Sequence, residues 1–186
     1  NGLPPLTHFL THSGFSSMNP RIIFSHGNSF PASTYQVMLD NLRQRGFQVD
    51  AIEMYGHDPK YPVTNNWPHL VQQLADFARD QQSDGEPAFL VGHSLGGILS
   101  LMCAARHPEL ARGVLLIDSP IIGGWRATTV GLAKRTPLIG ALSPGRISQK
   151  RRNHWPDAHA ALESFVHKKA FARWDPQVLR DYIEHG

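Results

Sequence analysis

The sequence predicts an α/β protein with a mostly parallel sheet flanked by helices. Three observations support this: short strand-like runs alternate with helical patterns, the runs are almost continuously apolar, and turn residues bound each of them. Strands that are apolar on both faces are typical of a parallel sheet that helices cover on both sides. Because strand and helix alternate along the chain, we expect right-handed crossovers and helices on both faces of one sheet.

Four strand-like runs carry this prediction, at residues 21–26, 47–54, 88–91 and 113–117. The last run has the composition of an interior strand, yet no later stretch of the sequence offers a strand to pair with it. An uncovered apolar edge invites strand addition or aggregation. We therefore expect the final strands of the fold to be missing from this chain, so that either the natural protein continues or a second chain completes the sheet.

Helical patterns with apolar residues on one face fill the gaps between these runs, at residues 33–45, 67–81 and 95–106. Ser33 or Thr34 is a candidate N-cap for the first pattern, because a short hydroxyl side chain can accept from the free N–H groups at a helix start. Gly46 is a candidate residue for its end.

The alternation stops after the fourth strand-like run. A stretch rich in Gly, Pro and Thr follows, and then two short helical patterns at 158–169 and 176–183. Asp175 is the predicted N-cap of the second. We therefore divide the chain into the N-terminal part of an α/β core, residues 1–120, and an incomplete helical cap or lid segment, residues 121–186.

Length and composition favour one soluble domain. A chain of 186 residues with 41% hydrophobic residues can bury one sizeable core, and no apolar run approaches the length of a membrane span. A single cysteine, Cys103, excludes an internal disulfide framework and fits a reducing compartment. We expect a cytoplasmic protein without a membrane partner, and we make no prediction of its oligomeric state.

The charge is unevenly distributed. Residues 1–120 hold seven Lys/Arg against ten Asp/Glu, a net charge of −3, whereas residues 121–186 hold eleven against five, a net charge of +6. A basic segment can bind nucleic acid, but these cations are scattered among Pro and Gly and match no nucleic-acid motif. A solvated basic face is the favoured interpretation, and we expect no nucleic-acid partner.

The sequence GHSLGG at residues 92–97 has the pattern of a serine held in a sharp turn between a strand and a helix. Gly92 and Gly96 leave room for the strand and the helix to pack closely. The helix then points its N-terminus at Ser94, so the N–H of Leu95 lies where negative charge on an oxygen would develop. The alternative is a glycine-rich turn with an inert serine.

A second element lies upstream, in His26-Gly27-Asn28 at the end of the first strand-like run. Gly27 lets the chain turn sharply, so the N–H of Asn28 can point at the same oxyanion as that of Leu95. His26 has an alternative role, in which its ring only hydrogen-bonds the loop.

In their order along the chain, these motifs resemble the α/β-hydrolase fold superfamily, in its serine-nucleophile, lid-bearing branch. The motifs are HGN at 26–28, YGHD at 55–58, GHSLGG at 92–97 and LIDS at 116–119. The resemblance covers residues 20–120 well and the rest only by position. It implies that residues 121–186 are the helical cap that members insert after the sixth strand of the superfamily fold.

Members of that superfamily carry an acid and then a histidine after the nucleophile, and we expect this chain to be truncated before both. Asp118 could serve as the acid, although a role in fixing the loop into the cap is favoured. Four histidines follow Asp118, and surface, lid-packing or helix-end roles are favoured over that of the base. They are His154, His159, His167 and His185.

Two further sets of residues have more than one interpretation. His93 is interpreted as a packing residue, and the His8 and His12 pair lacks a third ligand, so we predict no metal and no cofactor. Five aromatic residues of the cap segment could roof an apolar pocket, but a small core of the cap itself is favoured. They are Trp125, Trp155, Phe165, Phe171 and Trp174.

The resemblance implies an esterase-like serine hydrolase whose partner is a small-molecule substrate. The bond cleaved would be an ester, thioester, amide or similar acyl bond of a small, partly apolar molecule, through an acyl-enzyme intermediate. Because the nucleophile position holds Ser and not Asp, the alkyl-enzyme route to epoxides and carbon–halogen bonds is disfavoured. The alternative is a non-catalytic small-molecule binding protein on the same scaffold.

Overall fold

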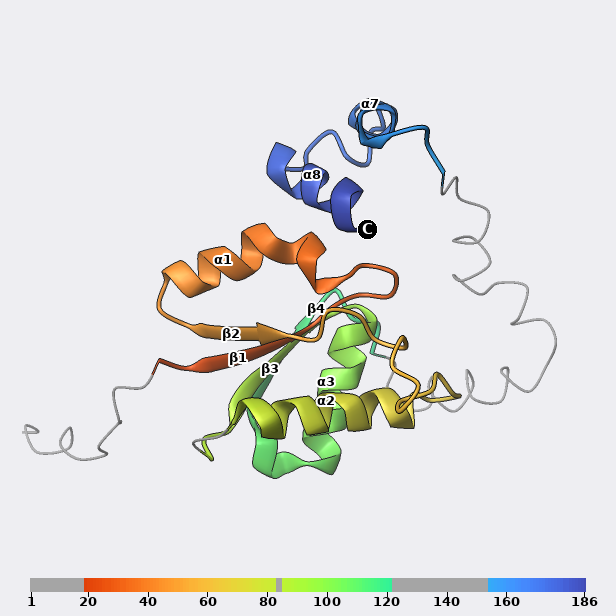
Figure 1. Ribbon diagram of the computed structural model, residues 1–186. Helices are drawn as coiled ribbons and strands as arrows, with labels where there is room; N and C mark the ends of the chain where they lie inside the picture. Colours follow the sequence, from red (N-terminus) through yellow and green to blue (C-terminus); the bar gives the residue numbers. More distant parts are fainter. Residues whose placement is uncertain (1–18, 83–84, 122–153) are drawn as a thin grey trace, which may run out of the picture.

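The computed structural model describes residues 19–82, 85–121 and 154–186. In these residues four parallel strands form one sheet in the order β2-β1-β3-β4 (Figure 1). The strands are β1 (Arg21–Ser25), β2 (Gln48–Ala51), β3 (Ala88–His93) and β4 (Ala111–Ile117). All four predicted runs form strands, and the predicted α/β fold with a parallel sheet is confirmed.

Helices follow the strands as the apolar periodicity indicates. They are η1 (Ala32–Tyr35), α1 (Gln36–Gln44), α2 (Pro68–Gln81), α3 (Leu95–Arg106), η2 (Pro108–Leu110), α7 (Ala158–Val166) and α8 (Pro176–His185). The predicted end of the first helix at Gly46 is confirmed, since α1 ends at Gln44 and Gly46 follows with a φ of 91°. The predicted N-cap of this helix is wrong. Thr34 lies inside the η1 turn, where its hydroxyl donates to the Pro31 carbonyl at 2.7 Å, and Ser33 donates to Glu53. Both hydroxyls therefore donate, one to a nearby carbonyl and one to a carboxylate of another loop, and neither accepts from an N–H at the helix start.

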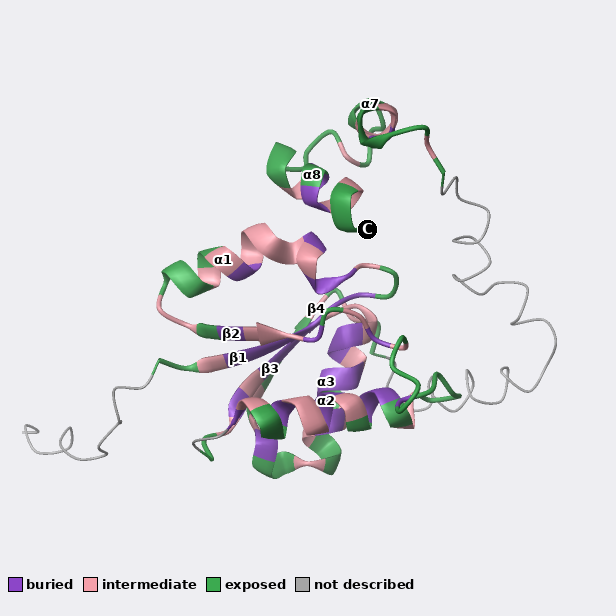
Figure 2. Ribbon diagram, viewed as in Figure 1, coloured by how far each residue is buried: buried purple, intermediate pink, exposed green. Residues whose placement is uncertain are grey.

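The two faces of the sheet are buried by different helices. Ile22 and Phe24 of β1 pack with α1 on one face, whereas Ile23 packs with α2 and α3 on the other (Figure 1). Figure 2 shows that β1 and β3, the two inner strands of the sheet, are largely buried. This is the physical reason for the continuous apolar composition of the runs, since successive side chains of a strand point to opposite faces.

The order of the strands creates a switch point between β1 and β3. The chain goes from β1 through α1 to β2 on one side, and then crosses to β3 on the other side of β1. The loops that leave the carboxyl ends of β1 and β3 therefore diverge and leave a crevice, which is where open α/β sheets bind ligands. The loop after β1 carries Asn28, and the turn after β3 carries Ser94.

The strand β4 lies at the edge of the described sheet. It pairs with β3 on one side, and no strand of the described residues pairs with its other side. Three consecutive apolar residues of β4 are exposed: Val114 (37%), Leu115 (57%) and Leu116 (37%). The predicted uncovered apolar edge is confirmed for the described part of the chain.

Residues 154–186 form a pair of helices, α7 and α8, which we call the C-terminal helix pair. The Asp157 carboxylate accepts from the Ala160 N–H at 2.7 Å, and the Asp175 carboxylate accepts from the Gln177 N–H at 2.7 Å. The predicted N-cap role of Asp175 is thus confirmed. The helix α8 packs against α7 and against η1 and α1, on the α1 side of the sheet (Figure 1).

Residues 122–153, which make up about half of the predicted cap segment, lie outside the described residues, and so does Trp125. Among the helices that the structure describes, none is long and apolar enough to cross a membrane.

Candidate active site

Ser94 lies between β3 and α3 in a conformation that L residues seldom adopt. Its φ is 52° and its ψ is −116°, a conformation that costs roughly 1–3 kcal/mol and is common at active sites. The main chain holds it there: its N–H donates to the Ile117 carbonyl at 2.9 Å, and its carbonyl accepts from the Ile98 N–H at 3.4 Å. Ser94 is half-buried, and its hydroxyl forms no hydrogen bond with any described residue.

Glycines let three pieces of backbone meet at this turn. A Cβ on Gly92 would overlap the backbone of Gly96, and a Cβ on Gly96 would overlap the carbonyl oxygens of Ser25 and His26. Glycine at these two positions predicted that the strand and the helix pack closely, and this close packing is confirmed. Because Gly96 allows α3 to touch the end of β1, the N-terminus of the helix lies beside the loop that carries Asn28.

His26 holds the loop that follows β1 through both of its ring nitrogens. It is 3% exposed, its Nε2 accepts from the Tyr55 N–H at 2.9 Å, and its Nδ1 lies 2.7 Å from the Gly27 carbonyl. Since Nε2 accepts a hydrogen bond, the proton of the neutral ring is on Nδ1 and points at the Gly27 carbonyl. Burial lowers the pKa of His26, in spite of that bond to Gly27. Both ring nitrogens are occupied, so His26 ties the β1 loop to the loop after β2.

The structure brings the two predicted oxyanion donors to one cavity. The Asn28 and Leu95 N–H groups donate to no carbonyl or side chain of the described residues, and both residues line the cavity. Ser94 is not among the lining residues, although it directly precedes Leu95. Two unoccupied main-chain donors at one cavity are the arrangement that can stabilise an oxyanion.

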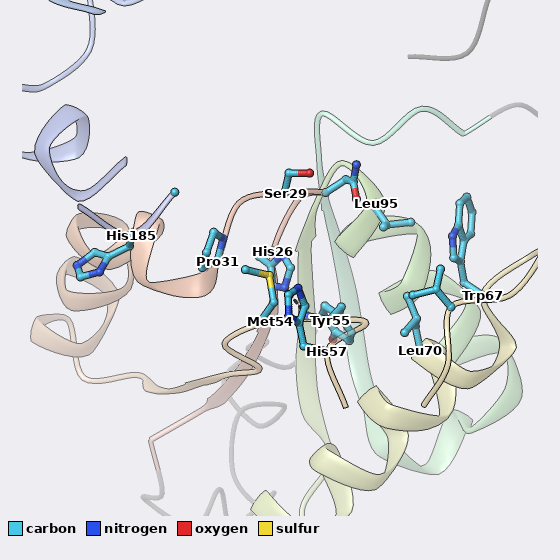
Figure 3. Close-up of a pocket in the computed structure, with 13 residues that line it drawn as sticks. His26, Ser29, Pro31, Met54, Tyr55, His57, Trp67, Leu70, Leu95 and His185 are labelled. Carbon is cyan, nitrogen blue, oxygen red and sulfur yellow. Dashed lines mark hydrogen bonds between the residues drawn. The ribbon is translucent and has the colours of Figure 1, made fainter. Parts of the chain in front are cut away.

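The cavity has a volume of about 430 Å³. One part of its wall is apolar and comes from Met54, Val63, Trp67 and Leu70. Figure 3 shows His26 and His57 near Met54 and Tyr55, with His185 of α8 on the side opposite Trp67 and Leu70. The described lining residues include three histidines but no Asp, Glu, Lys or Arg. Such a wall fits a small molecule that is partly apolar and partly hydrogen-bonding.

Asp118 follows Ile117 at the end of β4, with a φ of 43°. Its side chain is exposed and forms no hydrogen bond or ion pair with a described residue. It thus lies next to the carbonyl that holds the Ser94 N–H, at the correct end of the sheet for an acid. Neither proposed role for Asp118, as catalytic acid or as loop-fixing residue, is tested by this geometry.

No histidine of the described residues hydrogen-bonds the Ser94 hydroxyl. His154 and His159 are exposed, and His167 is an exposed residue of the C-terminal helix pair whose Nε2 lies 3.6 Å from the Glu163 carboxylate. His185 lies in the last turn of α8, as predicted for a helix-end cation, and it also lines the cavity.

The sequence did not single out Tyr35. Its hydroxyl lies 2.7 Å from Nδ1 of His93 and accepts from the Gly27 N–H at 3.1 Å. His93 therefore has a hydrogen-bonding partner as well as a ring contact with Tyr35, and its packing role stays a prediction. In the sequence Tyr35 was only one of the apolar residues of a helical face. Tyr35 and His93 are 58 positions apart, so no local pattern could have predicted their contact.

The aromatic residues of the C-terminal helix pair pack on one another. Phe165 lies 5.4 Å from Trp155 and 4.8 Å from Phe171, and Phe171 lies 4.8 Å from Trp174 (ring centroids). None of these four lines the cavity, which confirms the predicted small core. The sequence missed its fifth member, Tyr182, which contacts Phe165, Phe171 and Trp174.

Tyr182 also joins this aromatic core to the rest of the protein. Its ring lies 5.5 Å from Phe30, two positions after Asn28 in the loop that follows β1. The C-terminal helix pair therefore rests directly on the loop that carries one predicted oxyanion donor.

No metal site is found in residues 19–82, 85–121 and 154–186, which contain no group of three suitable side chains. His8 and His12 lie outside the described residues.

Comparison with known proteins finds hydrolases. The model of the Alpha/beta hydrolase family matches residues 22–184. An esterase of Mycobacterium tuberculosis is 33% identical over 100 residues, which cover 53% of this chain and 33% of that protein. A monoglyceride lipase homolog of Monkeypox virus is 23% identical over 176 residues, which cover 86% of this chain and 61% of that protein. The chain thus spans between a third and about three fifths of these relatives.

A solved structure has a similar fold. The crystal structure of E-2-(acetamidomethylene)succinate hydrolase matches 90% of this chain with a TM-score of 0.61, and the match covers 57% of that chain. The identity is 23%, so the likeness concerns the fold alone.

Proposed function

Because this chain belongs to the alpha/beta hydrolase family, we propose that the protein is a serine hydrolase of a small, partly apolar molecule. The bond cleaved is an ester, thioester, amide or similar acyl bond. One observation carries the proposal: a serine in a strained turn, with a hydroxyl free of hydrogen bonds to described residues, adjoins a cavity with two unoccupied main-chain N–H groups.

In the proposed reaction, the Ser94 oxygen attacks the acyl carbon while its proton passes to a general base. The negative charge that develops on the acyl oxygen is stabilised by the N–H groups of Asn28 and Leu95. The tetrahedral intermediate collapses, the leaving group departs with a proton from the base, and the acyl group stays on Ser94. Water then attacks this ester while its proton passes to the base, the acyl group leaves as a carboxylic acid, and the base returns the proton to the Ser94 oxygen.

The base in this proposal is a histidine, since a serine hydroxyl needs a neighbouring base to be nucleophilic at neutral pH. No described histidine is hydrogen-bonded to the Ser94 hydroxyl. Asp118 is a candidate for the acid that orients it, because it follows the strand next to β3.

We also propose that residues 121–186 serve as a cap over the α/β core of residues 1–120. This is supported by the packing of α8 on η1 and α1 and by the position of His185 in the cavity wall. A cytoplasmic location is favoured by the single cysteine, Cys103, which is buried and whose pKa burial raises to about 11.

The names of two relatives, an esterase and a monoglyceride lipase homolog, support an acyl substrate. The second candidate function is a binding protein that keeps the cavity without the chemistry. It is favoured by the absence of a histidine bonded to Ser94 among the described residues.

Labelling with a fluorophosphonate distinguishes the two functions, because this probe reacts with an activated serine. The natural protein that carries this chain is treated with the probe and the adduct is located by mass spectrometry. We expect one adduct at Ser94, its loss in Ser94→Ala, and full labelling of Ser29→Ala, a matched control because Ser29 lines the same cavity. An unlabelled natural protein would favour the binding protein, and an adduct that survives in Ser94→Ala would exclude Ser94 as the nucleophile.

A further inference from the structure

Tyr35 joins the two loops that carry the proposed oxyanion donors. Its hydroxyl accepts from the Gly27 N–H at 3.1 Å and lies 2.7 Å from Nδ1 of His93. Gly27 directly precedes Asn28, and His93 directly precedes Ser94. One hydroxyl thus links the backbone on which one donor depends to the turn that presents the nucleophile and the other donor.

The donors and acceptors can be assigned from the chemistry of the three groups. The Gly27 N–H can only donate a hydrogen bond, and a tyrosine hydroxyl has a single proton to donate. The arrangement that uses every group therefore has Gly27 donating to Tyr35 and Tyr35 donating to Nδ1 of His93. In the neutral ring, the remaining proton of His93 is then on Nε2.

The surroundings keep this relay in place. The Tyr35 ring packs against Phe24, with ring centroids 4.8 Å apart, and its edge contacts the His93 ring at 5.8 Å. Burial raises the pKa of Tyr35, so that the hydroxyl keeps its proton. The three groups are closely packed, since a Cβ on Gly27 would lie 2.8 Å from Nδ1 of His93 and 3.1 Å from the Tyr35 oxygen.

The position of the relay determines which step it affects. Asn28 is in an exposed loop, and its neighbours Ser29 and Phe30 do not belong to the sheet. Leu95, in contrast, is fixed by α3. Two donors stabilise one oxyanion only if the distance between them is fixed before charge develops. Without the Tyr35 link, the loop of Asn28 loses a tie to the turn of Ser94.

We propose that Tyr35 is a positioning residue that holds the Asn28 loop at the correct distance from the Ser94 turn. The inference rests on the proposed serine hydrolase function and deepens it. Because the oxyanion forms in the tetrahedral intermediate and the transition states that flank it, and not in the bound substrate, loss of the link lowers kcat and leaves KM nearly unchanged. Removal of a whole oxyanion donor costs roughly 100-fold to 1000-fold in kcat, so a displaced donor costs roughly 10-fold to 100-fold.

The test compares Tyr35→Phe with the natural protein, using hydrolysis of an activated ester and the rate of fluorophosphonate labelling at Ser94. Tyr61→Phe is the matched control, because the Tyr61 hydroxyl donates to Asp76 of α2, away from the site. We expect Tyr35→Phe to lower kcat and the labelling rate roughly 10-fold to 100-fold with KM and the Tm nearly unchanged. Tyr61→Phe is expected to leave kcat unchanged.

A second pair of variants tests the other end of the relay. Asn has an oxygen near the position of Nδ1, so His93→Asn keeps an acceptor for Tyr35, whereas His93→Leu removes it. We expect the first to retain most of the labelling rate and the second to fall to the level of Tyr35→Phe.

The outcomes separate this inference from the proposed function. If the natural protein is not labelled at Ser94, the hydrolase function fails and this inference with it. If the natural protein is labelled and Tyr35→Phe is labelled at the same rate, the inference alone is wrong. It is also wrong if Tyr61→Phe loses kcat equally, or if KM rises while kcat is constant.

Discussion

The Ser94 turn and the C-terminal helix pair meet the same loop, but different forces hold them. At the turn, backbone touches backbone, and three glycines leave no room for a single added methyl group. In the helix pair, five aromatic rings pack edge to face, at a tilt or stacked around Phe165, Phe171 and Tyr182, and several of them are partly exposed. One region is fixed by steric exclusion and the other by apolar contact of adaptable side chains.

The difference fits the proposed function. The proposed chemistry on an acyl group needs donors fixed to within a fraction of an ångström, which close-packed backbone provides. A segment that covers a cavity, which is the role proposed for the helix pair, can tolerate looser packing, because its energy comes from buried area and not from one geometry. We therefore expect substitutions at the turn to be severe and substitutions in the helix pair to be graded.

The largest effect is expected from Gly96→Ala. Alanine favours a helix over glycine by about 1 kcal/mol, but the new Cβ would overlap the carbonyl oxygens of Ser25 and His26. We expect a net loss of about 3 kcal/mol and a fall in Tm of roughly 10 °C, with loss of labelling at Ser94. Gly113→Ala is the control, since its Cβ would meet only the side chain of Phe89, at 3.1 Å. Equal Tm values for the two variants would contradict steric exclusion at the turn.

A smaller effect is expected from Phe165→Ala in the helix pair. The change removes ring contacts with Trp155, Phe171 and Tyr182, each worth about 0.7 kcal/mol. We expect the helix pair to lose about 2 kcal/mol and to become sensitive to limited proteolysis, while the sheet keeps its Tm. The neighbouring Val166→Ala is the control, because Val166 is 45% exposed. If Phe165→Ala unfolds the sheet as well, the two regions are not independently held.

The smallest effect is expected from pH and concerns His26, which ties the loops beneath the turn. Burial lowers its pKa in the folded state below the ordinary value of 6.5, so below about pH 6.5 the unfolded chain binds more protons at this position. Its contribution to the free energy of unfolding is complete above that pH and is lost as the pH falls through the folded pKa. We expect denaturant melts between about pH 7.5 and pH 5 to show a weaker pH dependence in His26→Gln than in the natural protein.

The control for this pH effect is His167→Gln, because the His167 side chain is 78% exposed on α7. Its melts are expected to keep the pH dependence of the natural protein. An unchanged slope in His26→Gln would show that His26 titrates alike in the folded and unfolded chains.

Much of the fold could be predicted from the sequence, because its signals are local. The apolar runs, the helical periodicity and the glycines around Ser94 all depend on residues that are close in the chain. The N-cap of the first helix was predicted wrongly, because the Ser33 hydroxyl donates to Glu53, 20 positions away, and the Thr34 hydroxyl donates to the Pro31 carbonyl instead of accepting from a helix N–H. The Asp175 cap was predicted correctly, because its partner, the Gln177 N–H, is two residues away.

By itself the sequence determined the parallel sheet, the strained serine turn and the acid-capped α8, since each follows from backbone sterics within a few residues. Only the tertiary structure decided that Tyr35 bonds His93 and that Tyr182 rests on Phe30. The physical reason is that these contacts join residues far apart in the chain. Their distances are set by how helices pack on the sheet, and short-range periodicity carries no information about that packing.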